Sequence, residues 1–248
     1  MENSKYDTLV KGHSAMTKNC NNQILEVLRN IQLFSSLNDD ELRQVKGKIE
    51  VKRFKKNEVI LHEENTNRVM YVILRGKVKV MQITAEGKEI ILAIHRAGDF
   101  FGEVSLIDSK TMPAIVVAKE DAIVAIISRG EFYSLLYSQG KVLDVLLQIL
   151  CARLRDSWER IQLLSFTNAS QRIKMLLALL ANQYGGKTTD GTLLNIKLTH
   201  QDIADMAGVA RETATRAIDK LSKDGEIKVL KNRFILLGPE FLQKEFRV

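Results

Sequence analysis

The 248 residues are 45% hydrophobic and 27% charged, a composition typical of a globular protein with one or two domains. The two cysteines, Cys20 and Cys151, exclude a disulfide framework and a cluster held by four thiolates, and they fit a reducing compartment. The net charge of +7 favours a polyanionic partner, but no dense basic tail is present.

The sequence lacks the signatures of membrane insertion, secretion and catalysis. No apolar run is long enough to cross a membrane and the polar N-terminus is no signal peptide, so we expect a cytoplasmic protein. The four histidines show no metal-ligand spacing, and no set of nucleophile, base and acid or phosphate-binding glycine loop is found. We therefore expect no metal site and no enzymatic activity.

The N-terminal part is predicted to be helical after a polar start. Residues 1–22 are polar and uneven, which predicts a flexible extension. An apolar stripe at helical spacing predicts a short helix over Ile24–Phe34. A second short helix is predicted over Leu37–Val45, with Asn38 as its cap.

From Ile49 the hydrophobic period changes to two, which predicts strands. Turn signals such as Arg75-Gly76 and Ala97-Gly98 separate seven short segments. The predicted strands are Val51–Phe54, Val59–Leu61, Val69–Leu74, Val78–Ile83, Ile90–Ile94, Ile115–Ala118 and Ala122–Ser128. Evenly spaced short strands favour a sandwich or barrel, because each strand buries a face against a second sheet. We assign residues 23–138 to this β-roll domain.

A long helix is predicted after the roll. Gly130–Ser138 is a short helix, and Lys141–Phe166 is a long one whose apolar residues step by fours and threes, interrupted only at Ser157. The stripe consists of Leu143, Leu147, Leu150, Leu154, Ile161 and Leu164. This spacing is typical of a coiled-coil seam and predicts that residues 139–166 are a dimerisation helix. Alternatively the helix docks on its own domain, because Val142, Val145, Leu146 and Ile149 widen its apolar surface.

Residues 167–248 are predicted to form a winged helix-turn-helix. A helix over Arg172–Gln183 is followed by a polar turn over Gly185–Gly191 and a strand over Leu193–Leu198. Next comes a short helix capped by Thr199, a sharp stop at Gly208, and a second helix from near Ala210. The apolar face of that second helix consists of Ala214, Ala217, Ile218 and Leu221. Ile227–Leu230 and Phe234–Leu237 are predicted to pair as a hairpin whose basic turn meets phosphates.

The second helix carries polar residues beside its apolar stripe, near its N-terminal end. These are Arg211, Glu212, Thr215 and Arg216. Helices that read the major groove place such residues at their start. Arginine binds guanine through two hydrogen bonds, and a carboxylate accepts from the cytosine amine. The alternative is a solvated helix face with ion pairs four residues apart.

Three segments resemble the CRP/FNR family of bacterial transcription regulators, over about residues 24–240. Tyr71–Val80 (YVILRGKVKV) resembles the family's strand–glycine–strand segment, and Gly98–Leu106 (GDFFGEVSL) its turn into the effector pocket. Ala210–Arg216 (ARETATR) is similar to the recognition helix of the cyclic-AMP receptor branch. The resemblance implies an α+β fold, with an N-terminal double-stranded β-helix (jelly roll), a long dimerisation helix and a C-terminal winged helix-turn-helix.

The same resemblance implies how the protein works. It would be a homodimer that binds a pseudo-palindromic, double-stranded DNA operator and acts with RNA polymerase, under control of an effector held between roll and long helix. Arg211 and Arg216 would read guanines and Glu212 a cytosine of TGTGA-like half-sites in an inverted repeat. The full predicted DNA-binding set is Thr199, His200, Gln201, Arg211, Glu212, Thr213, Thr215, Arg216 and Lys220.

The effector pocket departs from the family pattern. The predicted lining is Gly102, Glu103, Val104, Ser105, Met112, Pro113, Ala114, Ser157 and Trp158. Met112 and Pro113 stand where cyclic-AMP-binding members have the Arg-Ser pair that clamps the phosphate. Methionine cannot neutralise a phosphate and proline has no N–H, so cyclic AMP is disfavoured and the effector stays unidentified. Trp158 either packs at an interface or covers a flat ligand.

Other functions are left open by the residues alone. A haem or nitric-oxide sensor of the same family would draw its ligands from His62, His95, Cys151 or Met112. A ligand-binding regulatory module, of the kind attached to kinases or channels, would share the roll but has no use for a winged helix-turn-helix. Catalysis in a cupin-like roll needs a His/Glu metal set on the strands, which His62 and His95 alone do not supply.

Overall fold

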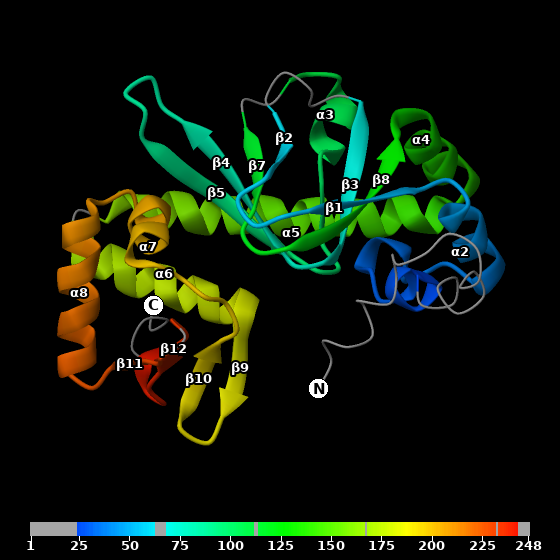
Figure 1. The fold of residues 1–248 in the computed structure, drawn as a ribbon. Helices are drawn as coiled ribbons and strands as arrows, with labels where there is room; N and C mark the ends of the chain where they lie inside the picture. Colours follow the sequence, from blue (N-terminus) through cyan, green and yellow to red (C-terminus); the bar gives the residue numbers. More distant parts are fainter. Residues whose placement is uncertain (1–23, 63–67, 112–113, 167, 232, 243–248) are drawn as a thin grey trace. The chain divides into compact units, whose positions relative to one another are not determined.

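A computed structural model describes residues 24–62, 68–111, 114–166, 168–231 and 233–242 (Figure 1). The predicted extension over residues 1–22 lies outside them. The chain separates into two compact units. The first contains the residues up to Gln82 together with Leu92–Cys151, and the second contains Ile83–Ile91 and the residues from Ala152 onward.

Two four-stranded sheets form the roll of the first unit. Ile83–Ile91, which includes the end of β4 and the start of β5, is grouped with the second unit. One sheet has the order β1 (Glu50–Phe54), β8 (Ala122–Ser128), β3 (Val69–Arg75), β6 (Phe100–Phe101). The other has the order β2 (Val59–Leu61), β7 (Ile115–Ala118), β4 (Lys77–Ile83), β5 (Glu89–Arg96). Neighbours such as β3 and β8 pair antiparallel, and crossovers link the sheets as in a jelly roll.

The strands β3 and β8 are apolar on both faces because two separate cores cover them. Met70 and Val72 of β3 belong to a cluster with the helices. Tyr71 and Ile73, which alternate with them, belong to the cluster between the sheets. The turn from β3 to β4 requires Gly76, whose φ is +90° and where a Cβ would lie 2.6 Å from the carbonyl oxygen of Asp121.

The helices of the first unit cover the outer core. Residues 24–29 are helical, followed by η2 (Gln32–Phe34) and α2 (Asp39–Lys46). Asn38 forms a capping box with Glu41, so the predicted cap is confirmed. Further along the chain lie α3 (Glu103–Asp108), which the periodicity did not predict, and α4 (Arg129–Ser138).

The long helix α5 (Gly140–Ser165) begins in the first unit. Its residues Val142, Leu146 and Ile149 are buried in the core with β3, β8 and α4. The alternative that this helix docks on its own domain therefore holds for its N-terminal half.

The second unit is a winged helix-turn-helix. Its elements are α6 (Ala169–Tyr184), β9 (Gly185–Thr188), β10 (Gly191–Leu194), α7 (His200–Ala207), α8 (Arg211–Lys223), β11 (Ile227–Val229) and β12 (Ile235–Leu237). The four strands form one sheet of order β11-β12-β10-β9. The polar turn predicted over Gly185–Gly191 is wrong, because Gly185–Thr188 pairs with Gly191–Leu194 as a hairpin.

The architecture confirms the predicted fold of jelly roll, long helix and winged helix-turn-helix. Among the described residues no single helix is long and apolar enough to cross a membrane, although α4 and α5, bent by 110° where they meet, satisfy that test as a pair.

Candidate nucleic-acid interface

The turn between α7 and α8 is fixed by residues at both ends of α7. The Thr199 side chain accepts from the amide of Asp202, and Asp202 accepts from the amide of Thr199 at 2.8 Å, a reciprocal cap. Gly208 ends the helix with φ +64°, a left-handed conformation that glycine adopts without strain. The two helices therefore meet at a defined angle, as a helix-turn-helix requires.

Helix α8 buries one face and exposes another. Its buried residues are Ala214, Ala217, Ile218 and Leu221, as the sequence predicted. Arg211, Glu212, Arg216 and Lys220 are exposed, while Thr213 and Thr215 are half-buried. The N-terminal half of α8 carries what we call the recognition face, which consists of Arg211, Glu212, Thr215 and Arg216. Its three charged side chains are exposed to solvent.

Contacts within the predicted DNA-binding set are few. Nδ1 of His200 lies 2.9 Å from the hydroxyl oxygen of Thr215. Gln201 donates to Asp205 at 2.7 Å, within α7. Arg216 lies 3.4 Å from the hydroxyl of Thr213, a long contact that leaves its guanidinium mostly unengaged. Arg211, Glu212 and Lys220 form no side-chain hydrogen bond or ion pair with any described residue.

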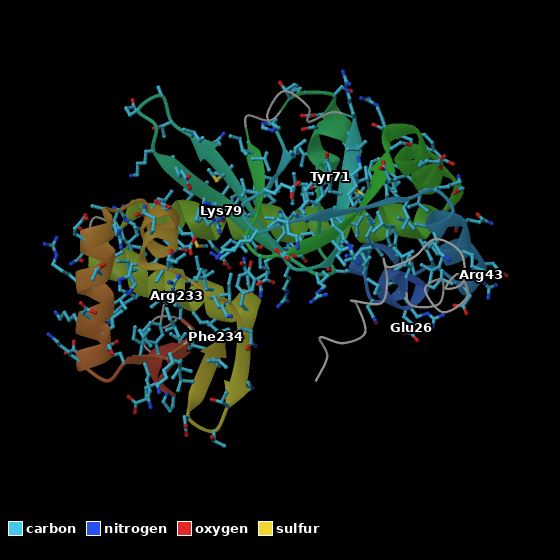
Figure 2. All side chains as sticks on the ribbon, viewed as in Figure 1. Glu26, Arg43, Tyr71, Lys79, Arg233 and Phe234 are labelled. Atoms are coloured by element: carbon cyan, nitrogen blue, oxygen red, sulfur yellow. The ribbon has the colours of Figure 1, made fainter. Side chains whose placement is uncertain are left out.

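The hairpin of β11 and β12 forms the wing. Its connecting segment carries the exposed residues Lys231 and Arg233, and Arg233 is labelled in Figure 2. Lys197 stacks over the ring of Phe234 with its ammonium 5.6 Å from the ring centroid. The basic turn that the sequence predicted for phosphate contacts is therefore present at the tip of the wing.

Arg172 is a residue of this unit that sequence analysis missed. Its guanidinium donates to the carbonyl of Phe166 at 2.9 Å and to the carbonyls of Ala207 and Gly208 at 3.2 and 3.3 Å. It thus ties the segment between α5 and α6 to the turn of the helix-turn-helix. No sequence motif indicates this role, because the carbonyls of Ala207 and Gly208 are about forty residues from that of Phe166 and are brought to Arg172 only by the fold.

The predicted effector pocket begins with α3. Gly102 has φ +90°, and a Cβ there would lie 3.0 Å from the carbonyl oxygen of Val69. Glu103 is only 1% exposed, and Ser105 and Ala114 are also buried, whereas Val104 is exposed. The structure thus places Glu103 and Ser105 in the interior of the roll unit. Met112 and Pro113 lie outside the described residues.

The remaining two pocket candidates belong to the second unit. The hydroxyl of Ser157 donates to the carbonyl of Arg153 at 2.9 Å, within α5. The Trp158 side chain is 59% exposed. An exposed indole is available for an interface or for a ligand.

The interior of the roll contains an aromatic stack that the sequence did not predict. Tyr71 and Phe101 stack with ring centroids 4.8 Å apart, and His95 lies parallel to Phe101 at 6.3 Å. Burial raises the pKa of the Tyr71 phenol above its usual range. Tyr71 is labelled in Figure 2.

Three of the candidate haem ligands, His62, His95 and Cys151, are described and belong to the first unit. His62 and Cys151 are exposed, and His95 is half-buried in the aromatic stack. Within the described ranges, no three His, Cys, Asp or Glu side chains gather closely enough to hold a metal ion.

An apolar stripe runs along α5 beside the face that carries its buried residues. Five of its residues are exposed: Leu143, Leu147, Leu154, Ile161 and Leu164. The sixth, Leu150, is half-buried against the core. We call these six residues the α5 stripe. Large aliphatic side chains exposed at this spacing are typical of a helix that packs against a second helix.

A cyclic nucleotide-binding domain model matches residues 51–139, and a Crp-like helix-turn-helix domain model matches residues 171–245. The chain is 32% identical over 181 residues to the cAMP-activated global transcriptional regulator CRP of Haemophilus influenzae, covering 72% of this chain and 80% of the relative. It is 27% identical over 197 residues to the cyclic AMP receptor protein of Thermus thermophilus, covering 79% and 88%.

A solved structure shares the fold. The CooA mutant from Carboxydothermus hydrogenoformans matches with a TM-score of 0.73 and 23% sequence identity, over 87% of this chain and 93% of that one.

Proposed function

The chain belongs to the CRP/FNR family of transcription regulators, and we propose that it acts as a homodimer that binds a TGTGA-like inverted repeat. RNA polymerase is its partner at the promoter, and an effector held by the roll controls its DNA affinity. The observation that carries the proposal is the recognition face, where two arginines and a glutamate are exposed on the N-terminal half of α8.

The chemistry of the recognition face supports this half-site. Arg211 and Arg216 each offer the planar fork that matches O6 and N7 of guanine, and Glu212 accepts from the cytosine amine. Arg211 and Glu212 have no protein partner among the described residues to compete with DNA. The exposed Lys231 and Arg233 of the wing add phosphate contacts that fix the position of the helix.

The α5 stripe supports the dimer. Two copies of α5 packed along this stripe would bury aliphatic side chains that are in water in the single chain. A two-fold dimer presents two copies of α8 about one helical turn of DNA apart, which is the geometry of an inverted repeat.

The interior of the roll supports an effector other than cyclic AMP. Glu103 is buried at the start of α3, but the Arg-Ser pair that clamps a cyclic phosphate is replaced by Met112 and Pro113 in the sequence. A ligand without a phosphate, such as a small organic or aromatic molecule, suits these residues better.

The test is binding of the full chain to a fluorescent duplex carrying an inverted repeat of TGTGA, compared with a scrambled duplex, with and without 3′,5′-cyclic AMP. Arg211→Ala is expected to reduce discrimination at one guanine by about 1–3 kcal/mol, while Ser222→Ala, exposed near the end of α8, leaves binding unchanged. Equal loss on scrambled DNA would refute the assignment of Arg211. A regulatory module without DNA function would bind neither duplex.

A further inference from the structure

A polar contact between two side chains joins the two helices of the helix-turn-helix. Nδ1 of His200, the first residue of α7, lies 2.9 Å from Oγ1 of Thr215 in α8. Both side chains are half-buried, and neither forms another side-chain hydrogen bond with the described residues. The Thr215 hydroxyl therefore has its partner inside the protein.

The contact allows two arrangements of its protons, because a threonine hydroxyl can donate to Nδ1 or accept from it. A threonine hydroxyl has one hydrogen to donate, and a neutral imidazole has one N–H and one acceptor nitrogen. With Nδ1 accepting from Thr215, the imidazole proton lies on Nε2. Two groups then stay available for DNA: the Thr215 methyl group and the Nε2–H of His200.

We propose that His200 and Thr215 act as one unit in DNA reading, in which the Thr215 methyl contacts a thymine methyl and the His200 Nε2–H binds a nearby phosphate. This proposal rests on the proposed function, because it requires α8 to lie in the major groove. His200 is then also a positioning residue, since its Nδ1 holds the Thr215 hydroxyl away from the base.

The positions of the two residues fit this division of roles. Thr215 follows Arg211 by four residues, so the two lie on the same side of α8. The thymine methyl is the apolar group that the major groove displays, and threonine methyl groups contact it in DNA complexes. His200 starts α7, and the first helix of such a motif crosses the DNA backbone.

The methyl contact is tested on the full chain with duplexes in which each thymine of the inverted repeat is replaced in turn by deoxyuridine, which removes only the methyl group. Wild-type affinity is expected to fall about four-fold at one thymine of each half-site, the effect of one buried carbon. Thr215→Ser keeps the hydroxyl and loses the methyl, so it should bind the thymine and deoxyuridine duplexes equally.

Two variants of His200 distinguish the role of its Nδ1 atom from the role of its Nε2–H group. His200→Asn places an acceptor oxygen near Nδ1 but has no counterpart of Nε2–H. It should keep the sensitivity to deoxyuridine, while its affinity for the repeat and the scrambled duplex alike falls about ten-fold per half-site, the loss of one hydrogen bond to a charged group. His200→Gln carries a donor near the position of Nε2 but no acceptor near Nδ1. It should keep the wild-type affinity for the scrambled duplex and lose the sensitivity to deoxyuridine.

Failure of this inference is distinguishable from failure of the proposed function. If wild type prefers the inverted repeat over scrambled DNA but no deoxyuridine substitution weakens binding, the methyl contact is refuted and the regulator stands. Equal behaviour of His200→Asn and His200→Gln would refute the division of roles. If wild type shows no preference for the repeat, the proposed half-site fails and the inference fails with it.

Discussion

Leu146 and Leu147 are adjacent on α5, yet Leu146 is 1% exposed and Leu147 is 52% exposed. A helix turns by about 100° per residue, so neighbours face different directions. Leu146 packs with the core that covers β3 and β8, and Leu147 belongs to the α5 stripe. One helix thus presents an apolar surface to its own unit and a second one to solvent.

Charges on the α5 stripe should separate the dimer. Leu147→Glu combined with Leu154→Glu places four carboxylates in the proposed seam, where burial without partners is unfavourable. We expect the double variant to be a monomer by light scattering, with its helical circular dichroism retained. The matched control is Gln148→Glu, an exposed position beside the stripe, which should stay dimeric. A double variant of unchanged mass would show that this stripe is no interface.

Leu146→Ala should act on stability instead of assembly. Its side chain is buried among β3, β8 and α4, so truncation leaves a cavity that costs about 2–5 kcal/mol. Urea unfolding should show the lower stability, while light scattering at native conditions still gives a dimer. A stable monomer would mean that this residue also supports the partner chain.

The carboxylate of Glu41 links α2 to the start of α5 in a pH-dependent way. Its oxygens accept from the Lys141 ammonium at 3.0 and 2.8 Å, and one also accepts from the amide of Asn38 at 2.7 Å. The hydrogen bond with Lys141 and then the one with Asn38 lower the pKa of Glu41 below its usual value.

The lowered pKa of Glu41 determines how the stability of the fold changes with pH. Because the folded-state pKa is lowered, the stabilising effect is present above the unfolded-state pKa of about 4.3 and is lost as the pH falls through the folded-state value. Glu41→Gln should therefore lower the melting temperature at pH 7, and the difference from wild type should shrink below about pH 4. Glu159→Gln, exposed on α5, is the control. A difference that is independent of pH would mean that charge is not the cause.

The sequence predicts those elements of the fold whose pattern lies within a few neighbouring residues. The period of the strands and the caps at Asn38 and Thr199 are local, and the structure confirms them. β9 was missed because Gly185–Thr188 carries glycine and threonine without an apolar alternation. Its place in the sheet comes from pairing with β10, which is a tertiary effect.

In the candidate site, too, the features set by neighbouring residues were predictable and the contacts between separate elements were not. Exposure of Arg211, Glu212 and Arg216 was predictable, because the apolar residues of α8 define the opposite face. The contact of His200 with Thr215 joins residues fifteen positions apart, and the stack of Tyr71 on Phe101 joins two strands. Neither contact has a periodic signal, since both depend on how separate elements pack.

Substitutions of Arg172 test how much its contacts, which join the segment after α5 to the turn of the helix-turn-helix, contribute to stability. Arg172→Met removes every donor and leaves the carbonyls of Phe166, Ala207 and Gly208 without this partner, at an expected cost of about 1–3 kcal/mol. Arg172→Lys keeps the charge but not the planar fork, so it reaches fewer of the three carbonyls and should fall between wild type and Arg172→Met. Urea unfolding followed by circular dichroism measures the order, with Gln171→Met, exposed on the same helix, as the control. If Arg172→Lys and Arg172→Met both match wild type, the three carbonyl contacts contribute nothing to stability, because water then satisfies those groups equally well.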